Sequence, residues 1–199
     1  MSRSTLSQSQ GGTALDKIIV INGKGGIGKD TLIDALKNAA PHYIHVTNVS
    51  SITPIMNACE KSGVVLGTEK DNAYRKLLSD MKSAIDNYYE TETGMAFTTK
   101  YLVNQTDRWK QLCLFGKATH HVLFVHIREP EMIKDFLTSN PDATTLLITS
   151  DRAQDSYGNP SDEGVNAWGY NYIFEANSTK ETEAQKFCSF IENILKEEN

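Results

Sequence analysis

The sequence of 199 residues has no long hydrophobic run; stretches such as 18–21 and 122–125 reach only four residues. A helix that crosses a bilayer needs about 20 apolar residues, so a membrane span is excluded. An excess of positive charge is also missing, because 20 Lys and Arg stand against 25 Asp and Glu, a net charge of -5. This balance argues against a protein that coats a nucleic-acid duplex, although local basic clusters are compatible with it. We therefore expect neither a membrane nor nucleic acid as a partner.

Cysteine is scarce, and its three occurrences, Cys59, Cys113 and Cys188, form no C-x-x-C pair. Their odd number rules out a closed disulfide framework and indicates buried thiols in a reducing compartment. Residues 1–16 are rich in Ser, Gln and Gly and have no apolar segment of the kind a secretory signal carries. We expect a disordered leader over 1–16 and a cytoplasmic protein.

Recognisable zinc spacing is absent from the five histidines, which show neither H-E-x-x-H nor a Cys/His pattern. The neighbours His120 and His121 stand at the entrance of an expected strand, where they cannot easily face one metal. The sequence therefore predicts no structural zinc. A G-x-S-x-G elbow is missing too, which removes the support for a serine hydrolase.

From residue 17 onward, short apolar segments alternate with longer amphipathic ones, as in an α/β domain with a parallel sheet between helices. We expect one domain over 17–199 with five strands, at 18–21, 43–49, 121–127, 144–149 and 170–174.

Three helices are also expected. One covers about 70–89 and buries a stripe made of Tyr74, Leu77, Leu78, Met81, Ile85 and Tyr88. Its other face carries Arg75, Lys76, Asp80 and Lys82, either as a solvated surface or pointing over a cleft. A second helix begins at Pro130, and a third follows a capping box of Ser178 and Glu181 near the C-terminus.

A glycine-rich segment follows the first expected strand and satisfies G-x-x-x-x-G-K at the start of an amphipathic helix. Glycines let successive N–H groups surround a polyphosphate, and the helix N-terminus adds partial positive charge. The segment predicts a nucleoside triphosphate site, with Lys29 reaching the β- and γ-phosphates. The phosphate-binding candidates are Gly23, Lys24, Gly25, Gly26, Ile27, Gly28, Lys29, Asp30 and Thr31.

Asp30 stands where the usual motif has a Ser or Thr whose hydroxyl binds Mg²⁺, and the hydroxyl comes one residue later, at Thr31. Asp30 and Thr31 are therefore the magnesium candidates. Asp30 could hold a metal-bound water, or serve only as the acidic partner of the helix dipole, while Thr31 could contact a phosphate.

This loop resembles two families. Residues 23–31 are similar to the deviant P-loop of the MinD/ParA/ArsA-type ATPases, in which Lys24 would act across a dimer. The sequence Gly28-Lys29-Asp30-Thr31 instead resembles the G-K-D-T form of deoxynucleoside monophosphate and phosphomevalonate kinases, and keeps the G-K-x-T spacing of adenylate kinases. The D-x-P-x-G segment of the ATPases has no match, which favours the kinase resemblance.

The kinase resemblance extends to two other segments. Residues 170–181 are similar to the strand-to-helix ending of nucleotide and dephospho-coenzyme A kinases, which implies adenine contacts from Asn177 and Ser178; an ordinary capped helix explains Ser178 equally well. Residues 124–130 resemble the kinase strand ending in D-x-R, in which Arg128 matches but His126 replaces the aspartate. Asp30, Glu129 and Asp151 are the candidate replacement carboxylates.

The resemblance also implies a short lid over about 151–165, where Arg152 would stabilise the transferring phosphoryl group or stand exposed at a strand end. Acceptor binding is implied for about 50–115, with Ser51 and Arg75 as the candidates. Trp109 in the same region could stack on a base or pack in the core.

Together these features predict a three-layer αβα P-loop NTPase fold with a five-stranded parallel sheet and a short lid. The expected function is transfer of the γ-phosphoryl of ATP, with Mg²⁺, to a small phosphorylated acceptor, with Lys29, Arg128 and Arg152 as catalytic residues. The alternative is a MinD/ParA-type ATPase switch that acts as a dimer, and a third possibility, suggested by His126 and the acidic lid, is a nucleotide-binding protein that has lost its activity. The oligomeric state, monomer or homodimer, and the identity of the acceptor stay open.

Overall fold

The computed structural model describes residues 15–64, 72–115, 120–151, 164–177 and 180–197. The first strand, β1 (Leu15–Asn22), begins two positions inside the leader expected over 1–16, so Leu15 and Asp16 belong to the sheet. Residues 1–14 of that leader lie outside the described part of the chain, as does most of the expected lid.

Five parallel strands form the sheet in the order β2-β3-β1-β4-β5, which confirms the predicted fold class. Strand β1 is central: β3 pairs with one of its edges and β4 with the other. The chain therefore adds strands on one side of β1 first and on the other side afterwards. The strands after β1 are β2 (Ile44–Ser50), β3 (His120–His126), β4 (Thr144–Thr149) and β5 (Tyr172–Glu175).

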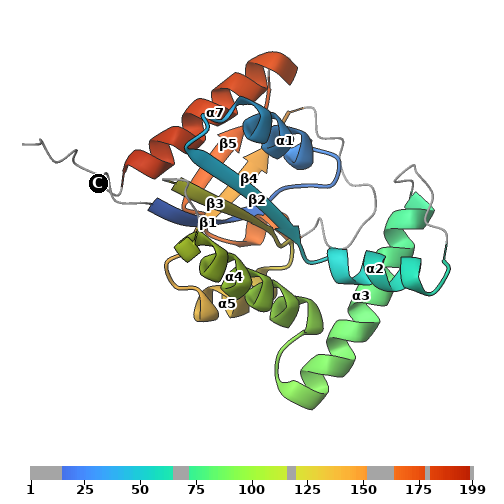
Figure 1. Ribbon diagram of the computed structural model, residues 1–199. Coiled ribbons are helices and arrows are strands. Elements are labelled where there is room, and N and C mark those ends of the chain that lie inside the picture. The colour runs from blue at the N-terminus through green and yellow to red at the C-terminus, as the bar shows by residue number, and fades with distance from the viewer. Residues whose placement is uncertain (1–14, 65–71, 116–119, 152–163, 178–179, 198–199) are drawn as a thin grey trace, which may run out of the picture.

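Helices cover both faces of the sheet (Figure 1), α1 and α7 on one side and α4 and α5 on the other. A pair of helices, α2 and α3, extends away from the sheet. The described helices are α1 (Lys29–Ala39), α2 (Thr53–Lys61), α3 (Asn72–Thr93), α4 (Phe97–Phe115), α5 (Pro130–Ser139), the short 3-10 helix η1 (Val165–Ala167) and α7 (Lys180–Lys196). None of the described helices has the length and apolar character that crossing a membrane requires.

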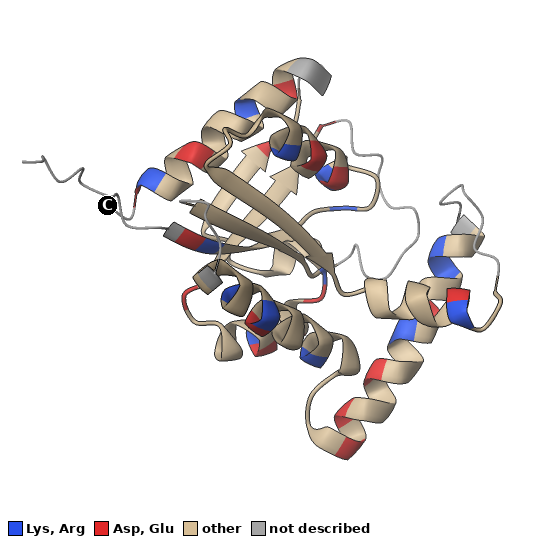
Figure 2. Ribbon diagram, in the orientation of Figure 1, with Lys and Arg blue, Asp and Glu red and all other residues tan. Residues whose placement is uncertain are grey.

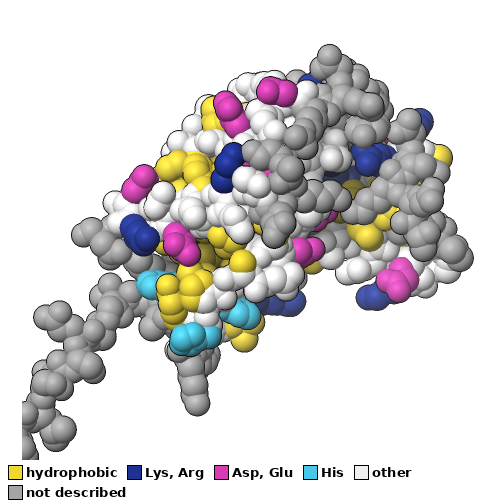
Figure 3. Space-filling view, turned by 90° about the horizontal axis from the view of Figure 1, so that it is seen from above, with side chains coloured by type: hydrophobic (Ala, Val, Ile, Leu, Met, Phe, Trp, Pro, Cys, Tyr) yellow, Lys and Arg dark blue, Asp and Glu magenta, His cyan; other side chains and the backbone are white. Residues whose placement is uncertain are grey.

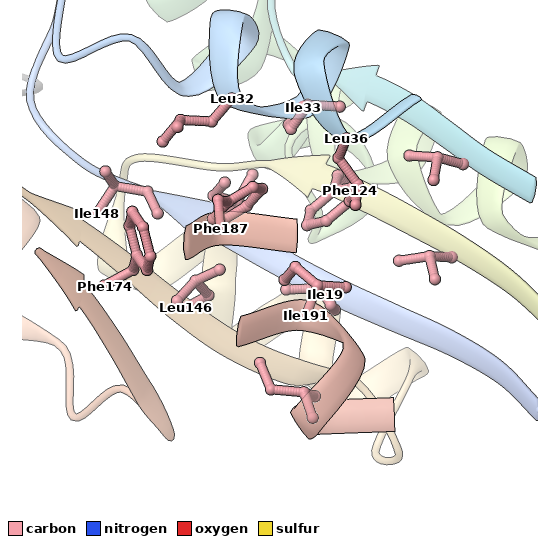
Figure 4. Close-up of a cluster of buried hydrophobic side chains, with 14 of the residues drawn as sticks. Ile19, Leu32, Ile33, Leu36, Phe124, Leu146, Ile148, Phe174, Phe187 and Ile191 are labelled. Carbon is pink, nitrogen blue, oxygen red and sulfur yellow. The ribbon is translucent and has the colours of Figure 1, made fainter. Parts of the chain in front are cut away.

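Alternation along β1 divides the core between the two faces. Ile19 and Ile21 point toward α1 and α7, where they pack with Phe124 and Phe187 (Figure 4). The next residues in the alternation, Ile18 and Val20, pack on the opposite face against α4 and α5. A strand buried on both faces must be apolar throughout, which is why 18–21 is a continuous hydrophobic run.

The buried stripe of α3 differs from the predicted one. Leu78 is buried as expected, but Leu77 and Tyr88 are 41% and 67% exposed. Buried in their place are Lys82 and Asp86, because each side chain neutralises the other inside the protein. Of the two placements expected for Lys82, a solvated surface or a position over a cleft, the structure agrees with the second, and Asp86 had no assignment.

Candidate functional site

The glycine-rich segment lies at the carboxyl end of β1, the strand at which the sheet reverses its direction of growth. In open parallel sheets this crevice is where ligands bind. Helix α1 begins at Lys29, with Gly28 as its N-cap, so the N–H groups of its first turn face the same crevice.

Three glycines of the loop have positive φ: Gly23 at 147°, Gly26 at 78° and Gly28 at 91°. Gly23 is also tightly confined, because a Cβ there would lie 2.7 Å from the carbonyl oxygen of Ile148 in β4. Only glycine satisfies both constraints, so the loop passes close to β4 and leaves its backbone open toward the crevice.

A fully buried asparagine, Asn22, anchors the start of the loop. Its Oδ1 accepts a 2.7 Å hydrogen bond from the Gly23 N–H, while its Nδ2 donates to the Arg128 carbonyl at 3.0 Å and to the Tyr170 hydroxyl at 2.7 Å. Tyr170 donates onward to the Val165 carbonyl at 2.6 Å, and burial raises the pKa of its hydroxyl to about 12. This network fixes the loop relative to the end of β3.

Lys29 extends over the loop that precedes it. Its Nζ donates to the carbonyl oxygens of Gly23 and Lys24, the latter at 3.0 Å. The ammonium group therefore lies inside the curve of the loop, where the phosphate oxygens of a nucleotide would be expected. The positive-φ glycines and this lysine together fit a polyphosphate.

One cavity of about 380 Å³ joins this loop to the acceptor region expected from the sequence. Lys29, Asp30, Thr31, Ser51, Arg75 and Arg128 all line it, although they come from four separate segments of the chain. The loop residues Gly26, Ile27 and Gly28 line it as well, whereas Gly23, Lys24 and Gly25 do not.

Arg75 and Lys76 lie in the first turns of α3, and the acidic residues predominate toward its end (Figure 2). The first described turn of α3 contains no acidic residue, although a helix dipole favours negative charge there. An anion in the cavity would therefore interact favourably with the cationic start of the helix.

Further along α3, the buried Lys82 connects three elements. Its Nζ lies 3.0 Å from the Asp86 carboxylate, 3.1 Å from that of Glu129 and 3.1 Å from the Met132 sulfur. Asp86 in turn accepts two 2.8 Å hydrogen bonds from Thr98, at the start of α4. Lys82 and Glu129 both line the cavity, so this network links α3 to the starts of α4 and α5 beside the cavity.

His126 ends β3 in the position where the resembling kinases have an aspartate. It is 9% exposed, and its Nε2 has no hydrogen-bond partner among the described residues. Burial lowers its pKa to about 4; the cations of Lys29, Arg128 and Lys37 act in the same direction, whereas Asp30 opposes them. The imidazole is therefore neutral at pH 7, and its Nε2 lies 3.9 Å from the Asp30 carboxylate.

The three candidate carboxylates are not equivalent. Asp30 and Glu129 line the cavity, and one buried oxygen of Glu129, Oε2, has no hydrogen-bond partner among the described residues. Asp151 instead lies beside Asn177, whose amide donates to its carboxylate at 3.0 Å and whose Oδ1 accepts from its backbone N–H at 2.8 Å. Asp30 and Glu129 are thus the two that face the proposed reaction space.

Some predicted site residues are not brought to the cavity. Asn177 joins the ends of β4 and β5 and is exposed. Arg152 and Ser178, and with them the expected lid and capping box, lie outside the described residues, so these assignments stay predictions.

Several cavity residues were not singled out from the sequence. Tyr74 packs against a core cluster, as expected, and also lines the cavity, whereas Ser50, Ser79 and Met56 had no individual assignment. Lys82 lines the cavity too, which agrees with the second of the two placements expected for its face, over a cleft. Leu78, Lys82 and Asp86 recur every four residues and therefore share one side of α3.

A parallel α/β sheet with a glycine loop and its lysine at the crossover strand defines a phosphate-binding P-loop fold. No protein-family model and no curated protein matches the sequence.

Many solved structures are similar to the chain, for example three proteins that match it over nearly its whole length. The tunicamycin resistance protein of Deinococcus radiodurans is 12% identical with a TM-score of 0.45, over 88% of this chain and 95% of that one. A mutant of the APS kinase of Mycobacterium tuberculosis is 12% identical with a TM-score of 0.43, over 89% and 98%. The shikimate kinase of Aquifex aeolicus is 12% identical with a TM-score of 0.41, over 88% and 96%. Similarity at this level does not identify a substrate.

Proposed function

We propose that the protein is an ATP-dependent phosphotransferase of the nucleoside monophosphate kinase class, which transfers the γ-phosphoryl group to a small phosphorylated acceptor. The observation that carries this proposal is the shared cavity, which has a phosphate loop on one side and Arg75 with Ser51 on the other. A protein that only hydrolyses ATP has no need for a second anion site beside the first.

On the donor side, the loop amides and the N-terminus of α1 would bind the triphosphate, and Lys29 would contact its β- and γ-phosphates. Arg128 lines the cavity at the end of β3 and is the candidate for stabilising charge on the transferring group. Both cations would stabilise the negative charge of the transition state, because each side chain extends into the site from a fixed backbone position.

The residues for a metal ion are Asp30 and Thr31, which are adjacent and line the cavity. Carboxylate and hydroxyl oxygens are ligands that Mg²⁺ accepts, and the side chain of Asp30 is 65% exposed, which leaves room for metal-bound water. When bound, Mg²⁺ would neutralise charge on the phosphate oxygens.

On the acceptor side, the guanidinium of Arg75 would bind the phosphate already present on the acceptor, because its planar donors match phosphate oxygens. The hydroxyl of Ser51 would orient the same group. Glu129, whose Oε2 has no hydrogen-bond partner within the described part of the chain, lines the cavity and is a candidate to accept the proton of the attacking hydroxyl.

The direct test is transfer from γ-labelled ATP to a panel of nucleoside monophosphates, deoxynucleoside monophosphates, phosphomevalonate and coenzyme A precursors. With the acceptor that responds, Lys29→Ala should lower kcat by about 100-fold or more, since it removes a donor aimed at the developing charge. Arg75→Ala should raise the KM for the acceptor by about 10- to 100-fold, the value of one lost charged hydrogen bond, and change the KM for ATP little.

Lys24→Ala is the matched comparison, because alanine keeps the Lys24 backbone, which contacts Lys29, and removes only a side chain that does not line the cavity. Its transfer rate should stay close to that of the unaltered protein. Unchanged turnover in Lys29→Ala would refute the site. ATP-dependent dimers that require Lys24, without any phosphorylated product, would favour the ATPase switch instead.

A further inference from the structure

Three side chains with metal-ligating atoms meet at the end of the sheet opposite the cavity. They are Asp16 at the start of β1, His121 at the start of β3 and Cys113 near the end of α4. One ligand atom from each lies within 4.8 Å of the other two. No other group of three or more such residues meets this criterion within the described part of the chain.

The sheet register places these groups in one row. Asp16 pairs with His121 across β1 and β3, and His45 pairs with the same His121 across β2 and β3. Paired residues of a parallel sheet point to the same face, which is here the face that α4 covers. Cys113, which belongs to α4, therefore lies on the same face as this row. The ring centroids of His45 and His121 are 6.1 Å apart.

We propose that Asp16, Cys113 and His121 form a binding site for a divalent transition-metal ion, namely zinc. Thiolate, imidazole and carboxylate are the ligand types that zinc accepts, and magnesium has no affinity for the first of them. His45, the next member of the row, is the candidate for the fourth position, which water would otherwise occupy.

The distances suit this ion. Zinc–ligand bonds of about 2.0–2.3 Å place neighbouring ligand atoms roughly 3.3–3.8 Å apart, so a set within 4.8 Å needs only small side-chain rotations. His121 is 6% exposed, and its Nδ1 already lies 2.9 Å from the Asp16 carboxylate, so its ring is held in the site.

Zinc binding would also connect elements from three separate parts of the chain. A bound zinc ion would form the Zn–S bond, and the thiol proton of Cys113 would leave to solvent. The site would then join the starts of two strands to α4.

Zinc here would be separate from phosphoryl transfer. Asp16 and Asn22 are the two ends of one strand segment, about 20 Å apart at roughly 3.3 Å per residue. The expected effect of the metal is therefore stabilisation of the folded chain, and the proposal stands or falls independently of the kinase activity.

The test uses the full chain, expressed without a polyhistidine tag, stripped of metal and titrated with Co²⁺ as a spectroscopic substitute for zinc. We expect one equivalent to bind with a sulfur-to-cobalt charge-transfer band. Zinc at about 100 times its dissociation constant should raise the melting temperature by roughly 5–10 °C. Cys113→Ser should lose the band, and Asp16→Asn should weaken zinc binding by at least about 10-fold.

Cys188→Ser is the matched control, because Cys188 is likewise half-buried but lies in α7, outside the group; it should keep the band. Asp16 is exposed at the surface, so Asp16→Asn tests the site even if Cys113→Ser fails to fold. His45→Ala decides between a fourth protein ligand and water. A cobalt spectrum without a thiolate band, a band that survives in Cys113→Ser, or zinc affinity unchanged in Asp16→Asn would overturn the proposal.

Discussion

Gly23 is under two independent constraints, a φ of +147° and a β4 carbonyl 2.7 Å from the position of a Cβ. We predict that Gly23→Ala lowers the free energy of unfolding by roughly 2–4 kcal/mol, because positive-φ strain and overpacking act together. Chemical denaturation measures the loss. It should also weaken ATP binding, since the loop must shift to relieve the contact.

Gly94 provides the comparison. Its φ is +75°, but a Cβ there would meet nothing within 4 Å, so Gly94→Ala should cost only the backbone strain of about 1–2 kcal/mol. Equal losses in the two variants would mean that the approach to β4 does not constrain the loop.

The sequence could assign candidate site residues where a local motif marks them, but not where their partners are distant in the chain. Lys29, Asp30 and Thr31 follow from the spacing of the loop itself, and all three line the cavity. Asn22 could not be assigned, because its partners Arg128 and Tyr170 lie 106 and 148 residues away. The cluster of Asp16, Cys113 and His121 escaped for the same reason, since it has no spacing to recognise.

At the scale of elements, α3 contains two Lys–Asp pairs with the same spacing and opposite surroundings. The Lys82–Asp86 side chains are 11% and 9% exposed, whereas those of Lys76 and Asp80 are 76% and 62% exposed. We predict that Lys82→Met destabilises the protein by about 3–5 kcal/mol, because it leaves two carboxylates without their cation. Thermal unfolding measures the difference.

Lys76→Met, the exposed counterpart, should change stability by no more than about 1 kcal/mol. Lys82→Met should also raise the KM of the acceptor, because Lys82 links α3 to Glu129 at the cavity. If both variants melt alike, the buried network does not hold α3 in place.

Elements with a clear periodic pattern were predicted well and the others poorly. The strand over 144–149 and the start of α5 at Pro130 agree with the structure. Helix α4 was not predicted, because buried threonines, Thr98, Thr99 and Thr106, interrupt its apolar pattern. The buried face of α3 differs from the predicted stripe, because Lys82 and Asp86 are buried through contacts with other elements. The local sequence pattern contains no information about these contacts.

For the whole molecule, alternation of strands and helices was sufficient to predict a parallel sheet between two helical layers. The order of its strands was not predicted, since it depends on which edge each crossover chooses. Figure 3 shows acidic and basic side chains interspersed on the described part of one face, in accordance with the nearly balanced composition.

The stability of the whole chain should depend on pH through His126. Its folded pKa of about 4 lies below the unfolded value of about 6.5, so between these pH values the unfolded chain binds the extra proton. Stability is therefore complete above about pH 6.5 and falls as pH decreases toward 4. This single group should contribute up to about 3 kcal/mol to the decrease.

The measurement is the free energy of unfolding of the unaltered protein and of His126→Gln, at several pH values between 4 and 7. The variant should lose less stability over this interval, because glutamine does not titrate. Parallel curves would show that His126 is not the group responsible.

The strand order also bears on how the chain folds during synthesis. β3 lies between β1 and β2, so neither of these first two strands has a hydrogen-bonded neighbour until residues 120–126 have been made. A nascent chain that has not yet reached His120 can form helices, but it has no two strands that the final sheet would pair. Assembly of the sheet must wait for the second half of the polypeptide, and the phosphate loop can take its final shape only after that point.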